Sequence, residues 1–165
     1  MKIDFNANWQ YRQLNSQFEW QTVDLPHDAL ICENRTSQSR CAKNIGWYEG
    51  LDYEYQKVFT LDQQYKNKVL TLEFEGVYRN AEVFINGQKV AYRPYGYTNF
   101  YVNVTKYVLF DQINTIRVIA KNSDQPNSRW YSGTGIYRPV FLHVQEKKHI
   151  LLNGIKVRTV QLSPA

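Results

Sequence analysis

Residues 127–140 contain the side chains best suited to hold a polar, ring-shaped ligand. Trp130 and Tyr131 each combine a flat apolar face with a polar tip, and such a face can cover the apolar C–H patch of a pyranose. Arg129 offers a planar fork of hydrogen-bond donors for hydroxyl groups. Together with Asn127, these residues form the predicted substrate-binding set.

The aromatic pair also has a purely structural interpretation. Trp130 and Tyr131 could simply pack against the body of the domain or against a neighbouring domain. Arg129 fits that role less well, because arginine is seldom buried without a partner. Gly133 and Gly135 follow directly, and they indicate a tight backbone path that a Cβ would obstruct. Both interpretations place this run in a loop beside a strand end.

Other polar residues are better explained by structure than by chemistry. His27 is predicted to be a packed histidine, and Asp24 and Asp28 beside it are predicted to make turn or cap hydrogen bonds. Glu73 and Glu75 lie two residues apart on one strand face. A catalytic acid and nucleophile pair of carboxyl groups would have to lie roughly 5–5.5 Å apart across a bound substrate. Two glutamates along one strand are instead predicted to be solvated, so no catalytic residue is assigned.

Several other classes of function are not indicated. The sequence has no glycine-rich phosphate loop, no HExxH, no G-x-S-x-G and no metal-ligand spacing, so no cofactor and no metal site are predicted. Twenty basic and 15 acidic residues give a net charge of +5, but without a run of five basic residues, so no nucleic-acid partner is expected. Two cysteines, Cys32 and Cys41, leave their pairing open.

The cellular location is left open by the sequence. No apolar run reaches 18 residues, so no membrane span is predicted. The first residues develop no apolar signal region. The protein is expected in the periplasm or outside the cell if a precursor carries a signal peptide, and in the cytoplasm otherwise.

The elements that must position the candidate residues are strands. Hydrophobic residues alternate with period two in four segments, 69–75, 100–104, 116–121 and 140–144, which predicts strands with one buried face. Asn86-Gly87 between residues 81–85 and 88–91 predicts a hairpin with a type I′ turn. About eight strands and no clean helical period favour an all-β, antiparallel β-sandwich or jelly roll.

The chain is predicted to divide near residue 148. Residues 1–148 form the sandwich, and residues 149–165 form a linker and a strand-like piece at 155–160. That piece could be the last strand of the sandwich or the first strand of a truncated neighbouring domain. The charged residues before it favour the neighbour.

Five segments occur in an order that resembles a known family. They are residues 20–28, residues 46–48 with 55–59, residues 74–87, residues 96–100, and residues 127–140. In this order, over about residues 5–145, they resemble the N-terminal sugar-binding domain of bacterial β-galactosidases of glycoside hydrolase family 2.

The resemblance implies a galactose-binding-domain-like jelly roll that is not itself catalytic. In the family the loop equivalent to residues 127–140 reaches the rim of an active site, whose catalytic glutamates belong to a separate barrel. This chain is therefore predicted to be inactive alone, while its parent is predicted to be a retaining hydrolase of terminal β-galactosides or related β-glycosides. The expected partners are a carbohydrate substrate and the barrel and immunoglobulin-like domains of the same chain.

One residue departs from the family pattern. Several relatives place an Asp that touches the sugar where this sequence has Arg129, so a contact here is expected to donate hydrogen bonds, and a metal bridge becomes doubtful. The alternative hypothesis is an autonomous carbohydrate-binding module, which differs from the first in predicting tight sugar binding by the isolated chain.

Overall fold

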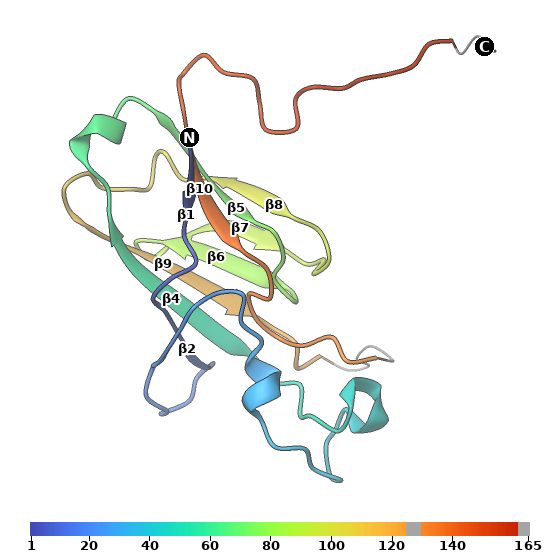
Figure 1. The fold of residues 1–165 in the computed structure, drawn as a ribbon. Coiled ribbons are helices and arrows are strands. Elements are labelled where there is room, and N and C mark those ends of the chain that lie inside the picture. The colour runs from blue at the N-terminus through green and yellow to red at the C-terminus, as the bar shows by residue number, and fades with distance from the viewer. Residues whose placement is uncertain (125–129, 162–165) are drawn as a thin grey trace.

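The computed structural model describes residues 1–124 and 130–161, and in these ranges the chain is an antiparallel β-sandwich. Figure 1 shows the two sheets facing each other. One sheet has the order β1 (Lys2–Asp4), β10 (Val140–Gln145), β5 (Val69–Phe74), β8 (Phe100–Asn103). The other has the order β3 (Gln21–Val23), β2 (Trp9–Gln13), β4 (Tyr53–Thr60), β9 (Ile113–Ala120), β6 (Ala81–Ile85), β7 (Gln88–Arg93). Three short 3-10 helices, η1 (Ala29–Cys32), η2 (Ala42–Ile45) and η3 (Gln63–Tyr65), lie in the connections. The predicted all-β sandwich is confirmed.

The core lies between the two sheets, where the predicted alternation places apolar side chains. On β5, Leu70, Leu72 and Phe74 are almost fully buried, and Leu72 pairs directly with Leu142 of β10. Val118 of β9 is fully buried in the facing sheet. Burial of each large aliphatic side chain contributes about 1.5–3 kcal/mol, so these faces hold the layers together.

The predicted Asn-Gly hairpin is confirmed and joins β6 to β7. Asn86 and Gly87 have φ angles of 49° and 80°, which a type I′ turn requires at both central positions. The register shifts beyond the turn, where Val83 pairs with Ala91 but Phe84 pairs with Lys89. One extra residue, Val90, is thus inserted in β7 as a β-bulge.

The prediction that Glu73 is solvated was wrong. Glu73 is only 6% exposed, because it lies on β5 between β10 and β8 and their side chains cover it. Its carboxylate accepts hydrogen bonds from His143 at 2.7 Å and from Tyr101 at 3.0 Å, and it lies 3.1 Å from the Lys2 ammonium. Burial by itself raises the pKa of Glu73, but these hydrogen bonds outweigh it and lower the pKa to about 2.

We expect this carboxylate to make the domain sensitive to acid. Because the folded pKa of about 2 lies below the unfolded value, the stabilisation is complete above pH 4.5 and is lost as the pH falls through 4.5 towards 2. It amounts to about 3 kcal/mol, of which about 2 kcal/mol disappears between pH 7 and pH 3. Urea denaturation at both pH values should show a smaller pH dependence in Glu73→Gln than in the wild type. Glu75→Gln, on the same face but partly exposed, should match the wild type, and equal pH dependence in Glu73→Gln would contradict the assignment.

The segment after β10 does not extend either sheet. Within the described residues, 155–160 form no strand, and Val157 and Val160 are almost fully exposed. Figure 1 shows this part of the chain leading away from the sandwich. The strand-like pattern is therefore not the last strand of this sandwich, and its assignment to a neighbouring domain stays a prediction.

Candidate functional site

Two loops bring exposed aromatic side chains together, and a hydrogen bond between Trp130 and Tyr97 joins them. One loop, residues 94–99, joins β7 to β8, and the other precedes β10. We call Tyr95, Tyr97, Trp130 and Tyr131 the aromatic patch; Trp130 is 61% and Tyr131 is 44% exposed. The indole Nε1 of Trp130 donates to the Tyr97 hydroxyl at 3.1 Å, and the Tyr95 and Tyr97 rings lie 5.6 Å apart. Trp130 of one loop thus contacts Tyr97 of the other.

Asp28 anchors the loop that carries Trp130 and Tyr131. Its Oδ2 accepts a hydrogen bond from the Tyr131 hydroxyl at 2.5 Å, and its Oδ1 accepts from the backbone N–H groups of Thr134 at 2.9 Å and Leu30 at 3.1 Å. Burial, together with the hydrogen bond to Asp28, raises the pKa of Tyr131, so its hydroxyl stays a donor. One carboxylate thus ties two segments together over 106 residues of sequence.

The predicted tight backbone path at Gly133 and Gly135 is confirmed. A Cβ at Gly133 would lie 2.7 Å from Oδ2 of Asp28, and a Cβ at Gly135 would overlap the hydroxyl of buried Tyr55. Gly135 also has a φ of 132°, a conformation that side chains disfavour. Its backbone exchanges hydrogen bonds with Tyr78 at 2.9 and 3.0 Å. The path of the loop is therefore fixed by its neighbours.

Buried polar groups also make hydrogen bonds to the loop that carries Trp130 and Tyr131. Asn122 is fully buried, and its Nδ2 donates to the Gly133 carbonyl at 3.0 Å and to Thr134 Oγ1 at 2.8 Å. The backbone N–H groups of His27 and Ala29 donate to the carbonyls of Ile136 and Thr134. Satisfied buried networks of this kind favour a single conformation. The aromatic patch is thus presented on a rigid support.

His27 and its flanking aspartates have the structural roles expected of them. The His27 ring packs 4.2 Å from the Tyr11 ring, and its Nδ1 lies 2.8 Å from the Tyr55 hydroxyl. Burial lowers the pKa of His27, which favours the neutral imidazole. Asp24 accepts a hydrogen bond from the Asn8 N–H at 2.7 Å, and Asp28 caps η1. The sequence did not reveal that Asp28 also reaches the distant loop.

The structure places two of the four predicted binding residues. Trp130 is 61% and Tyr131 44% exposed, and the Tyr131 ring also packs against Tyr48 with centroids 5.6 Å apart, so the binding and packing interpretations both stay predictions. The indole N–H of Trp130 and the hydroxyl of Tyr131 are both bonded within the domain. Asn127 and Arg129 lie outside the described residues. Sequence reasoning missed Tyr95 and Tyr97, although aromatic residues on either side of a glycine after a proline were a usable signal.

Three further observations apply to the described ranges, 1–124 and 130–161. No group of three His, Cys, Asp or Glu side chains there is arranged to hold a metal ion. None of the helices in these ranges has the length and apolar character needed to cross a bilayer. Cys32 and Cys41 are not joined by a disulfide, and the Cys41 thiol lies 3.3 Å from the Glu49 carbonyl.

The chain is similar in sequence to proteins named β-galactosidase and putative β-glucuronidase. It is 38% identical to the β-galactosidase BoGH2A of Bacteroides ovatus over 90% of this chain and 19% of that protein. It is 31% identical to a putative β-glucuronidase of Formosa agariphila over 96% of this chain and 16% of that protein. The chain therefore spans less than a fifth of the length of these relatives.

Solved structures show the same fold. A glycosyl hydrolase family 2 member from Bacteroides cellulosilyticus superposes with a TM-score of 0.79 at 31% identity, over 88% of this chain and 20% of that one. A β-glycosidase from Bacteroides vulgatus gives a TM-score of 0.79 at 33% identity, over 87% and 20%. The family model described as glycosyl hydrolase 2 galactose-binding domain-like matches residues 9–161. The chain belongs to this family of galactose-binding-like domains of glycosyl hydrolase family 2.

Proposed function

We propose that this chain is the non-catalytic N-terminal sugar-binding domain of a retaining β-galactosidase-type hydrolase. The parent would cleave terminal β-galactosides or related β-glycosides, with its catalytic glutamates in a separate barrel. Support comes from relatives that are named β-galactosidase and putative β-glucuronidase, of which the matched region covers 19% and 16%. On this proposal the chain alone is inactive.

The aromatic patch carries the proposal. All four aromatic residues of the patch are at least 40% exposed, and exposed apolar patches commonly mark interfaces. The Trp130 face can cover one face of a sugar, with Arg129 and Asn127 supplying polar contacts from the same loop. Tyr95 and Tyr97, on the neighbouring loop, would pack on the barrel. The domain would then complete the rim of an active site that it does not itself contain.

The test is kinetic and uses the full-length parent. Trp130→Ala and Arg129→Ala are each expected to lower kcat/KM for an aryl β-galactoside about tenfold, which corresponds to about 1.4 kcal/mol of lost transition-state binding. Phe18→Ala is a matched control, because Phe18 is 67% exposed but lies outside the patch, and it should leave kinetics unchanged. Normal kinetics in both patch variants would assign the patch to a structural role.

Calorimetry of the chain alone separates this proposal from an autonomous carbohydrate-binding module. The isolated chain would supply only one wall of the proposed site, so we expect it to bind galactosides weakly or not at all. A Kd tighter than about 10 μM, roughly 7 kcal/mol, would favour the autonomous module instead.

A further inference from the structure

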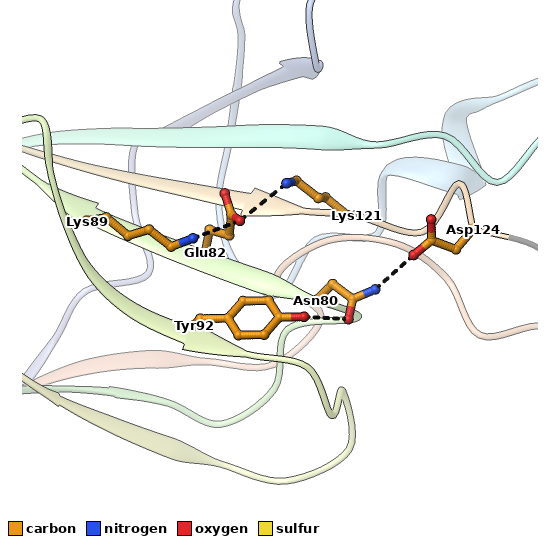
Figure 2. Close-up of a pocket in the computed structure, with 6 residues that line it drawn as sticks. All are labelled: Asn80, Glu82, Lys89, Tyr92, Lys121 and Asp124. Atoms are coloured by element: carbon orange, nitrogen blue, oxygen red, sulfur yellow. Dashed lines mark hydrogen bonds and ion pairs between the residues drawn. The ribbon is translucent and has the colours of Figure 1, made fainter.

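A polar pocket lies on the outer face of the larger sheet, at its β7 edge. It has a volume of about 280 Å³ and shares no residue with the aromatic patch. Figure 2 shows its lining, which is polar and of both charges. The lining residues are Asn80, Glu82, Lys89, Tyr92, Lys121 and Asp124.

The bulge in β7 builds this pocket. Lys89 and Tyr92 are three residues apart, and in a regular strand they would point to opposite faces of the sheet. The extra residue Val90 changes this, since Tyr92 pairs with Glu82 while Lys89 pairs with Phe84. Glu82 and Phe84 share a face, so Lys89 and Tyr92 both lie on the outer face with Glu82. Bulges are a recognised way to redirect side chains at sites.

One side of the pocket is a cluster of three charges. Oε1 of Glu82 accepts hydrogen bonds from Nζ of Lys89 at 2.9 Å and Nζ of Lys121 at 3.3 Å, as Figure 2 shows. The hydrogen bond from Lys89 is the main cause that lowers the pKa of Glu82. The carboxylate therefore stays ionised and keeps both ammonium groups directed at the pocket.

The other side is a chain of neutral and acidic groups. The Tyr92 hydroxyl donates to Oδ1 of Asn80 at 3.2 Å, and Nδ2 of Asn80 donates to Oδ2 of Asp124 at 3.4 Å. Tyr92 is 55% exposed, and Nζ of Lys89 lies over its ring, 5.5 Å from the centroid. With Asp124 included, the lining carries two ammonium groups and two carboxylates, so its net charge is zero.

We propose that this pocket is a second carbohydrate site, which binds one ring of a neutral sugar chain against Tyr92. A sugar hydroxyl donates and accepts at once, so adjacent hydroxyls match a lining that holds both ammonium donors and carboxylate acceptors. The balanced charge gives no net attraction for an anion. The volume is at the lower limit for ligand pockets, which suits a single ring. Surface ion pairs add little stability, so the fold alone does not require this cluster.

The site is tested by NMR titration of amide resonances of this chain with methyl β-D-galactopyranoside and with lactose. We expect saturable shifts at residues 80–82, 89–92 and 121, with a Kd in the millimolar range. Tyr92→Ala and Lys89→Met should each weaken this binding at least tenfold. Tyr95→Ala is the matched control, because Tyr95 is also 55% exposed but belongs to the aromatic patch, and it should leave the shifts unchanged.

The outcomes separate this site from the rim proposed above. Shifts confined to residues 95–97 and 130–131, abolished by Tyr95→Ala but not by Tyr92→Ala, would overturn the pocket and support the rim. Absence of saturable shifts up to about 50 mM sugar would overturn the pocket without affecting the rim, which needs the barrel. Sodium glucuronate, the anionic probe, should bind no tighter than the neutral sugars, and tenfold tighter binding would overturn the assignment of a neutral ligand.

Discussion

Replacement of Gly135 by alanine is expected to destabilise the domain by about 4 kcal/mol. Two costs combine at this position. The φ of 132° is strained for any residue with a Cβ, and the added methyl would overlap the hydroxyl of Tyr55. Tyr55 is fully buried and its hydroxyl is bonded to His27, so it has no free space to move into. The loop would have to break its hydrogen bonds with Tyr78.

Gly87→Ala separates the two costs. Gly87 also has a positive φ, of 80°, but no atom lies within 4 Å of an added Cβ, so only backbone strain of about 1 kcal/mol is expected. Urea denaturation of the two variants and the wild type measures the difference. Equal losses in the two variants would show that strain alone matters and that the contact with Tyr55 does not fix the loop.

The sequence was informative where one face of a strand is buried and the other is not. The period-two pattern at 69–75 and 140–144 marks strands because Leu70, Leu72 and Leu142 must all point into the core. The same rule failed for Glu73. On a central strand the outer face is also covered, and the covering groups, Lys2 and His143, are about 70 residues away in sequence. A local pattern does not contain that information.

The candidate site, like the sheets, was predictable from local sequence but not in its long-range contacts. Composition marked Trp130 and Tyr131 because aromatic side chains in a glycine-containing loop suit a ligand surface. Long-range pairing then decided what supports them, and the partners Tyr97 and Asp28 are distant in sequence. The polar pocket was not predictable at all, since the inserted residue Val90 decides which face Lys89 occupies. If side chains alternated regularly along β7, Lys89 would lie on the face of the sheet opposite to Tyr92.

Asp28→Ala is expected to cost about 3–4 kcal/mol of stability and to release the aromatic patch. The carboxylate serves three donors, and removing it leaves the N–H groups of Leu30 and Thr134 without their acceptor. Both residues are fully buried, and each unsatisfied buried donor costs about 1–3 kcal/mol. The loss of the bond to Tyr131 adds a consequence for function, because Trp130 is carried on the same loop. We therefore expect lower stability together with a change in intrinsic fluorescence well below the unfolding transition, and because the chain has four tryptophans this change should be absent when Trp130 is replaced by Phe.

Two further variants make this result specific to the loop anchor. Asp28→Asn retains an oxygen that can still accept from both N–H groups, so it should lose only about 1–2 kcal/mol, mainly the charge-assisted part of these bonds. Asp24→Ala removes the neighbouring aspartate, whose carboxylate serves one backbone N–H in an exposed position, and it should cost about 1 kcal/mol without a fluorescence change. If Asp24→Ala and Asp28→Ala behaved alike, Asp28 would be an ordinary helix cap. The rigid presentation of Trp130 would then have to come from Asn122 and Gly135 alone.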